Sequence, residues 1–329
     1  SPMKKLVLKL LLYIFLILLL LEIMVRAFHL YAEDPPRFID DLGVEKRVPG
    51  YRGYSVTGNR NQNFSEFNIN KAGFNSHREF TPTKDKFEIA LIGDSFIEGF
   101  HQDFDNSIAV KIEAQLDDTE VYQYGYAGYD LANQMHLIHA YKEQFALTDK
   151  IILYLNYQSD LGRGSYEPNV QRIKMLSSPV FKIRDNIKLL SYSSKIGVID
   201  PIKNLLTGRS FDDNPRQRFQ EHLEELQHRQ ENPETQKELL DNFKSLVALY
   251  GYDKCKTTLL LDSRKTSDSF LRYCRENNFK YIDFAPTFEL SEEPVTLIYD
   301  RHWNNHGRDL IAKVVSEYYK TLDKAQDCE

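Results

Sequence analysis

The sequence predicts an α/β fold: a three-layer α/β/α domain with a mainly parallel sheet, preceded by an N-terminal transmembrane helix. Three observations support this prediction. From residue 87 onward, short apolar runs typical of buried strands alternate with amphipathic helical segments. Apolar residues make up 42% of the 329-residue chain and charged residues 27%, which is enough for a full core. An apolar run near the N-terminus is long enough to cross a membrane.

The core elements are expected in the order strand, helix, strand, helix, strand. The three strands are predicted at 89–92, 120–124 and 150–155, and the helices between them at 107–116 and 131–145. The alternation resumes later, with strands at 256–262 and 280–284 and helices at 267–276 and 307–322. Such alternation is typical of a parallel sheet covered by helices on both faces.

Three parts are expected along the chain: a membrane anchor at 1–32, a stalk and edge segment at 33–86, and one domain at 87–329. Residues 33–58 are rich in charge, proline and glycine, and therefore favour a stalk, while residues 59–75 suggest a short strand or two on the domain edge. The domain carries an insertion at about 161–250. Within it, Asn214-Pro215 and Asn232-Pro233 each predict the start of an amphipathic helix.

The N-terminal apolar run carries no charge over residues 10–21 and reaches the length of a membrane helix over residues 6–25. The segment begins with three lysines, Lys4, Lys5 and Lys9, and these favour a cytoplasmic N-terminus. Lys9 lies near the end of the apolar run, where its side chain can extend to the membrane interface. The rest of the chain would then lie outside the cytoplasmic membrane. A cleaved signal peptide is the main alternative, although residues 25–31 offer no clear small-x-small cleavage site. A buried soluble helix is disfavoured because the run is apolar on every face.

Charge and cysteine content exclude some classes of function. The net charge is −6 and no long basic run follows the N-terminus, so nucleic acid is not an expected partner. The cysteines, Cys255, Cys274 and Cys328, lack the spacing of a thiolate metal site, although a Cys255–Cys274 bridge could form in an oxidising compartment. His136 and His139 have a permissible metal-ligand spacing without a third ligand nearby, which favours a structural role. We expect no metal and no cofactor.

The first candidate for chemistry is Ser95, in the turn Gly93-Asp94-Ser95 that follows the first core strand. A serine at a strand-to-helix turn projects its hydroxyl from a rigid scaffold. The helix that follows directs free backbone N–H groups at any negative charge that forms there. The alternative is a plain turn, because all three residues are common in turns.

Two further segments end neighbouring strands. Gly128 lies between the second strand and its helix, where a bare backbone N–H faces the end of the sheet, as an oxyanion hole requires. A simple strand-to-helix turn would look the same. The third strand ends in Asn156-Tyr157-Gln158-Ser159-Asp160, and several side-chain amides there could face the same edge.

The last candidate pair is Asp300 and His302, which precede the final helix. Residues two apart in an extended or loop segment point to the same side. The carboxylate could therefore bind one imidazole nitrogen and leave the other for a serine, which is the base-and-orienter arrangement of a hydrolytic triad. His306 is a rival base, but its position at the start of the final helix favours a cap or surface role.

Together, the Gly-Asp-Ser turn, the glycine after the second strand and the Asp-x-His pair resemble the SGNH (GDSL-type) hydrolase family. The resemblance covers roughly residues 87–322, interrupted by the insertion. It implies an SGNH hydrolase-like fold in which Ser95 is the nucleophile and Asp300 and His302 complete the triad.

The same resemblance implies an oxyanion hole made by Ser95, by Gly128 and by an asparagine of the third block. That block usually reads Gly-x-Asn-Asp in the family. Here Ser159-Asp160 occupies the corresponding position, and the candidate asparagine, Asn156, lies three residues earlier.

The Asp-x-His-Trp form at 300–303 is similar to membrane-associated and periplasmic polysaccharide O-acetyltransferases, including those of alginate. Such proteins often work beside an integral-membrane acyltransferase of the MBOAT class. The resemblance thus implies a single-pass protein of the bacterial cytoplasmic membrane with a periplasmic catalytic domain. Its partners would be the membrane, an acylated glycan or acyl donor, and an MBOAT-type acyltransferase.

Two hypotheses of function follow. The first is a serine O-acyltransferase or esterase that acts on acyl esters of a cell-envelope or exported glycan through an acyl-enzyme. The sequence does not separate transfer from hydrolysis. The alternative, motivated by the irregular third block, is a non-catalytic glycan-binding or scaffold subunit of a membrane acyltransferase complex.

Overall fold

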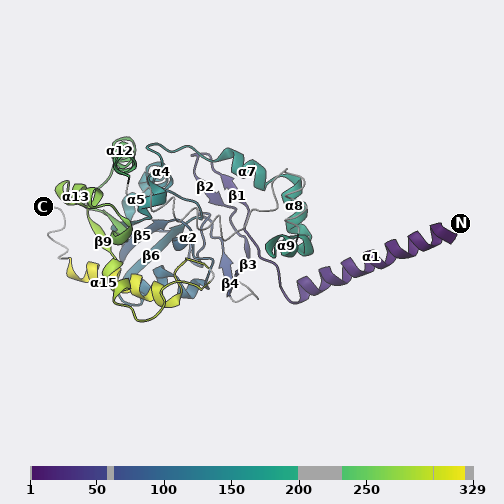
Figure 1. The fold of residues 1–329 in the computed structure, drawn as a ribbon. Helices are drawn as coiled ribbons and strands as arrows, with labels where there is room; N and C mark the ends of the chain where they lie inside the picture. Colours follow the sequence, from purple (N-terminus) through teal and green to yellow (C-terminus); the bar gives the residue numbers. More distant parts are fainter. Residues whose placement is uncertain (1, 58–62, 199–231, 299, 323–329) are drawn as a thin grey trace.

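A parallel sheet of five strands forms the centre of the protein in the computed structural model, which describes residues 2–57, 63–198, 232–298 and 300–322 (Figure 1). The strand order is β6-β5-β7-β8-β9, and every neighbouring pair runs parallel. The strands are β5 (Phe87–Gly93), β6 (Thr119–Gly125), β7 (Lys150–Leu155), β8 (Thr257–Leu261) and β9 (Tyr281–Asp283). The parallel arrangement places the carboxyl ends of all five strands along one edge of the sheet.

Helices cover both faces of this sheet, because alternate strand residues point to opposite sides. In β5, Ala90 and Ile92 join one core cluster, whereas Ile89 and Leu91 join the other. The first face is covered by α4 (Leu131–Ala140), α5 (Lys142–Leu147), α12 (Pro233–Tyr250) and α13 (Asp268–Glu276). The second is covered by α3 (Ile108–Glu113), α14 (Ala285–Glu289) and α15 (Asn305–Thr321). The predicted three-layer fold is confirmed.

The helices differ from the prediction in two places. The single helix expected at 131–145 is divided at Tyr141 into α4 and α5. The insertion expected at about 161–250 ends before α12, because this helix buries Leu239, Phe243 and Leu246 in the core and covers the sheet between β7 and β8. The helix start expected at Asn214-Pro215 lies outside the described residues.

The segment expected as a stalk, residues 33–58, instead packs against the domain. It contains β1 (Arg37–Ile39) and β2 (Glu45–Arg47), which pair antiparallel, and β3 (Arg52–Thr57), which pairs with β4 (Asn63–Asn68). All three residues of β2 are buried despite their charge. Arg47 is the most buried of the three, and an ion pair compensates its charge, since Arg47 Nε donates to Glu98 Oε1 at 2.8 Å.

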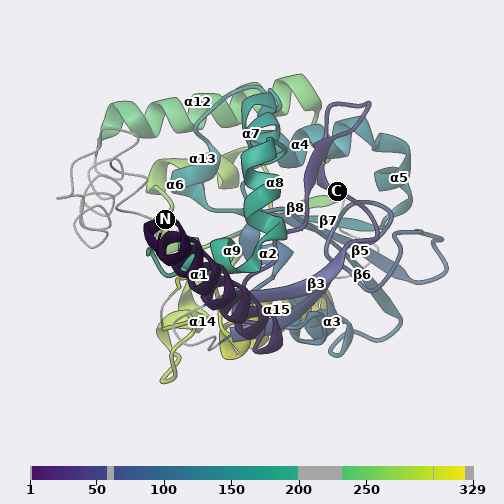
Figure 2. The same cartoon turned by 90° about the vertical axis from the view of Figure 1, so that its right-hand side faces the viewer.

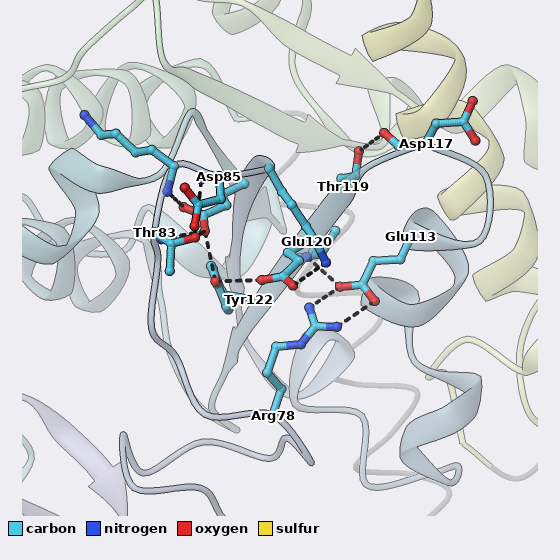
Figure 3. Close-up of polar contacts among 12 residues, drawn as sticks. Arg78, Thr83, Asp85, Glu113, Asp117, Thr119, Glu120 and Tyr122 are labelled. Carbon is cyan, nitrogen blue, oxygen red and sulfur yellow. Dashed lines mark hydrogen bonds and ion pairs between the residues drawn. The ribbon is translucent and has the colours of Figure 1, made fainter.

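A polar network closes the amino-terminal edge of the sheet, opposite the edge where the strands end (Figure 3). Arg78 binds Glu113 at the end of α3, and Glu113 accepts from the backbone N–H of Val121 at 2.7 Å. The Tyr122 hydroxyl donates to Glu120 at 3.0 Å. These bonds fix the start of β6 against the end of α3.

The helix α1 (Pro2–Ala27) leaves the body of the protein as a single long arm (Figure 1). By length and composition it could cross a membrane, as a signal sequence also could. Its most apolar stretch is unburied, so it is not a core helix. The helices α7 (Val170–Leu176), α8 (Pro179–Asn186) and α9 (Lys188–Lys195) lie on the side of the body from which α1 departs.

The thiol of Cys274 is buried and forms no disulfide, so the bridge considered between Cys255 and Cys274 is absent. Burial raises the pKa of Cys274 to about 12, which leaves this thiol protonated and unreactive.

Candidate active site

Ser95 lies at the carboxyl edge of the central part of the sheet. It is the first residue of α2 (Ser95–Glu98), which begins directly after β5 ends at Gly93. Asp94 caps this helix by accepting a hydrogen bond from the Phe96 backbone N–H at 2.8 Å. Gly93 is required by the tight turn, because a Cβ there would lie 2.4 Å from Cγ1 of Ile97. The local sequence therefore fixes the serine hydroxyl at a sharp, well-packed turn.

Ser95, His302 and Asp300 form one hydrogen-bonded chain. His302 Nε2 lies 2.7 Å from Ser95 Oγ, and His302 Nδ1 contacts Asp300 Oδ1. The same carboxylate oxygen accepts from the His302 backbone N–H at 2.9 Å, which holds the ring in place. With Nδ1 donating to the carboxylate, Nε2 is left to accept the serine proton. Residues 207 positions apart in the sequence thus meet in the order that proton abstraction requires.

The loop that carries Asp300 and His302 is anchored by Trp303. This side chain is buried, with its ring centroid 5.1 Å from that of Tyr154 on β7 and 4.8 Å from that of Phe96 on α2. Phe96 also packs on the His302 ring at 4.5 Å. The tryptophan therefore holds the loop that carries His302 against the helix that carries Ser95.

A second imidazole, His101, joins this site and was not anticipated from the sequence. Its ring stacks on His302 with centroids 3.8 Å apart, and its Nε2 lies 3.2 Å from Asp300 Oδ2. Burial lowers the pKa of His101, although Asp300 opposes this, so the ring is neutral near pH 7 and donates to the carboxylate. Partial burial would raise the pKa of Asp300, but hydrogen bonds from His101 and His302 lower it well below its ordinary value.

The carboxylate and the two imidazoles also have the spacing of a metal site. One ligand atom from each of His101, Asp300 and His302 lies within 4.8 Å of the others. Both oxygens of Asp300 and the Nε2 of His302 are already engaged in the contacts described, and these contacts account for the cluster by themselves.

Three N–H donors end adjacent strands around Ser95. The backbone N–H of Ser95 follows β5, that of Gly128 follows β6, and the side-chain amide of Asn156 follows β7. Within the described ranges, none of these three groups donates a hydrogen bond to the protein. Because β5 lies between β6 and β7, Gly128 and Asn156 follow the two strands that neighbour the strand leading to Ser95. An oxyanion hole needs such an arrangement.

Gly128 has a backbone conformation that favours glycine, with φ of 102°. A Cβ at this position would also lie 2.6 Å from Nη1 of Arg172. Arg172 belongs to α7, so the insertion brings a guanidinium to the rim of the site. The sequence pattern did not single out this arginine.

Two buried carboxyls lie beneath the serine turn. Burial raises the pKa of Asp94 to about 6, and burial together with the Asp94 charge raises that of Asp160 well above its ordinary value. Asp160 accepts from the Asn156 backbone N–H at 2.8 Å and from Ser159 Oγ at 2.7 Å. The third-block aspartate thus holds the backbone of the asparagine that precedes it.

The remaining histidines considered from the sequence lie elsewhere. His306 is in the first turn of α15 and contacts Ser291 Oγ at 2.9 Å. His136 Nε2 lies 3.0 Å from the Leu42 carbonyl oxygen, and His139 packs edge-on against the ring of Tyr250. Their contacts are structural, and neither His136 nor His139 belongs to the metal-spaced cluster.

No protein-family model matches the sequence, and no curated protein is similar enough to count as a relative. Solved structures do show similarity. A member of the lipolytic protein G-D-S-L family from Veillonella parvula is 16% identical, with a TM-score of 0.37 over 71% of this chain and 99% of that one. A lipase/acylhydrolase from Enterococcus faecalis is 12% identical, with a TM-score of 0.38 over 71% and 95%.

A catalytic mutant of an acetylxylan esterase from Geobacillus stearothermophilus is 10% identical, with a TM-score of 0.35 over 72% of this chain and 95% of that one. At such low TM-scores and identities, the similarity carries no weight for activity. One fold hosts many chemistries, so the function has to come from the side chains of the site.

Proposed function

We propose that this protein is a membrane-anchored serine esterase or O-acyltransferase that acts on acyl esters of a cell-envelope or exported glycan. The observation that carries this proposal is the hydrogen-bonded chain from Ser95 through His302 to Asp300. Serine is a weak nucleophile at its ordinary pKa, and an adjacent base oriented by a third group is the usual means of activating it.

In the first half of the reaction, His302 Nε2 takes the proton from Ser95 Oγ as the oxygen attacks the ester carbonyl carbon. The carbonyl oxygen becomes an oxyanion, which the N–H groups of Ser95 and Gly128 and the amide of Asn156 would stabilise. The ester C–O bond then breaks, and His302 returns the proton to the departing alcohol. Asp300 stabilises the imidazolium that exists between these two proton transfers. When the alcohol has left, the acyl group remains bound to Ser95 Oγ.

In the second half, a hydroxyl group attacks the acyl carbon while His302 accepts its proton. Transfer results when that hydroxyl belongs to a glycan, and hydrolysis results when it belongs to water. The tetrahedral intermediate collapses, the acyl–Oγ bond breaks, and the proton on His302 returns to Ser95. The guanidinium of Arg172, which approaches Gly128 from α7, would then contact the acceptor.

The location and partners extend this proposal. The length and composition of α1 support a membrane-spanning segment, and the lack of a clear small-x-small site at residues 25–31 favours an uncleaved anchor. The basic residues at the start of α1 favour a catalytic domain outside the cytoplasmic membrane. The Asp-x-His-Trp form supports a glycan acceptor and an MBOAT-type partner that supplies acyl groups.

Mass measurement of the glycan after reaction separates acyl transfer from hydrolysis, because transfer adds an acyl group and hydrolysis removes one.

The test of the serine uses a fluorophosphonate probe and an ester substrate on the full chain. The parent protein should be labelled and should turn over the ester, whereas Ser95→Ala should lose labelling and at least about 10³-fold in rate. A matched control is Ser263→Ala, since Ser263 follows β8 at the same edge of the sheet.

Equal labelling of the Ser95→Ala variant would contradict the proposal. A folded parent chain that binds glycan but is never labelled would instead favour the alternative, a non-catalytic glycan-binding or scaffold subunit.

A further inference from the structure

The carboxyl-terminal end of α1 is bonded to the start of α9. Glu22 accepts hydrogen bonds from the backbone N–H groups of Lys188 at 3.1 Å and Leu189 at 2.6 Å. Arg26 Nη2 donates to the backbone oxygen of Asn186, which ends α8, at 2.7 Å. If α1 spans a membrane, these bonds hold α8 and α9 at the level where the helix leaves the bilayer.

The face beside α1 is formed by the insertion. Figure 2 looks at the molecule from the side on which α1 projects, and α7, α8 and α9 lie toward the viewer. In Figure 1, α8 runs across the direction of α1 rather than along it. If α1 crosses a bilayer, the long side of α8 rather than one of its ends therefore faces the bilayer surface.

Apolar side chains are exposed on this face. Val180, Ile183 and Ile187 are all exposed and form what we call the apolar stripe. Val180 and Ile183 are three residues apart on one face of α8, and Ile187 follows directly after this helix. The exposed apolar residues continue through and past α9: Leu190, Ile196 and Val198. Surface residues of this kind are unremarkable singly, but a contiguous set marks a site of contact.

The charge of this segment is opposite to that of the whole chain. Residues 170–198 contain six lysines or arginines and a single acidic residue, Asp185, whereas the chain carries a net charge of −6. Exposed apolar residues among lysines and arginines are typical of helices that lie in the interface of an anionic bilayer.

A cavity of about 420 Å³ lies between α8 and residues 32–37, away from Ser95. Its lining includes five cationic side chains, among them Arg52, Lys182 and Lys188, and three acidic ones, Glu33, Asp34 and Asp185. Cationic groups therefore outnumber acidic ones in the cavity beside α8.

We propose that α8 and α9 rest on the surface of an anionic bilayer, with the apolar stripe inserted among the lipids beside α1. This inference rests on the proposed insertion of α1. It adds that the insertion between β7 and β8 is a second, interfacial contact with the membrane.

The test places a tryptophan on the stripe in the full chain, reconstituted in phosphatidylcholine–phosphatidylglycerol vesicles with brominated acyl chains. The variant is Ile183→Trp, and the control is Leu249→Trp. The two positions are matched because both side chains are 55% exposed. They differ in location, because the control lies on α12, far from α1. The parent chain supplies the background. We expect about twofold quenching at position 183, since interfacial helices reach about 5–10 Å into the boundary, and none at position 249.

The outcomes separate the two proposals. If alkaline carbonate releases the parent chain from the vesicles, α1 is not inserted, and both the anchor and this inference are overturned. Alkali-resistant protein with no more quenching at 183 than at 249 would overturn the inference alone. That same result is expected if a partner membrane protein, rather than lipid, covers this face.

A charge variant tests the anionic surface. Lys174→Glu with Lys182→Glu, in the Ile183→Trp background, should reduce the quenching in these vesicles, because both lysines are exposed near the stripe. Unchanged quenching would overturn an anionic bilayer as the occupant of this face.

Discussion

His101 and His302 stack face to face, with ring centroids 3.8 Å apart and an interplanar angle of 19°, and both rings contact the carboxylate of Asp300. One carboxylate therefore orients two imidazoles, of which only His302 reaches the serine. His101 acts through Asp300 and is a positioning residue. Because the His101 ring is neutral, it does not repel the His302 ring when His302 takes up a proton.

Replacing His101 with phenylalanine should keep the ring packing and remove the hydrogen bond to Asp300. A hydrogen bond to a charged group contributes about 1.5–3 kcal/mol, so kcat should fall by about 10–100-fold. KM should stay close to that of the parent, since the contacts of His101 in this site are with Asp300 and His302 rather than with Ser95. The pKa of Asp300 should rise toward its ordinary value, because one of the hydrogen bonds that lower it is lost.

The matched variant is His101→Gln, which retains an N–H donor and should recover most of the lost kcat. Equal losses in the two variants, or a change in KM alone, would argue against a positioning role.

Replacing Asn156 with alanine should remove one donor to the oxyanion. The expected loss is about 10²–10³-fold in kcat, with little change in KM, because the bond forms in the transition state. Steady-state kinetics on an ester substrate measure both constants. Asn277→Ala, at the end of α13, is the control, and a parent-like kcat in Asn156→Ala would place the third donor on another residue.

Replacing Asp94 with asparagine should stabilise the protein at neutral pH. Burial raises the pKa of Asp94 to about 6, from 3.8. A carboxyl whose folded-state pKa is raised favours folding fully below its unfolded pKa, and this contribution is lost as the pH rises through about 6. Asparagine can still cap α2 and carries no charge.

The gain from Asp94→Asn should therefore be small near pH 4 and reach on the order of 1–3 kcal/mol at pH 8. Denaturant melts of the parent and the variant across this range measure it. A gain that is largest at low pH would contradict the assignment.

Replacing Glu98 with glutamine should destabilise the fold. Glu98 and Arg47 are both buried and form an ion pair at 2.8 Å. Removing one partner leaves a buried charge with weaker compensation, at a cost of about 3–5 kcal/mol in the free energy of unfolding. The same substitution at Glu317, whose ion pair with Lys313 is exposed, should change stability little. Arg47 Nη1 also lies 2.6 Å from Asp34 Oδ1, and equal effects at the two positions would show that Asp34 alone compensates Arg47.

The strand order explains why much of the site could be anticipated. Ser95, Gly128 and Asn156 each follow an apolar strand, and parallel strands that alternate with helices end at one edge of the sheet. The contact between Asp300 and His302 followed from their spacing. How the loop of residues 300–303 reaches Ser95 could not be read from any local pattern, because it depends on the burial of Trp303 between β7 and α2.

Other features left no signal in the sequence. His101 lies in the loop after α2 and has no periodic neighbours, so only its place six residues after the serine could have suggested it. The strand β2 is short and fully charged, and a hydrophobic pattern cannot reveal burial that an ion pair with Glu98 makes tolerable. Arg172 belongs to an insertion without a clean period, and its approach to Gly128 is a tertiary contact.

Trp303 gives this protein a built-in spectroscopic probe. It is the only tryptophan in the sequence, and its indole packs against Phe96, next to Ser95 on α2, and against Tyr154 on β7. The tryptophan emission of the unlabelled protein therefore originates beside the proposed active site. Titration of a substrate analogue can be followed in native material, and a shift in that emission would report movement of the loop of residues 300–303 relative to α2.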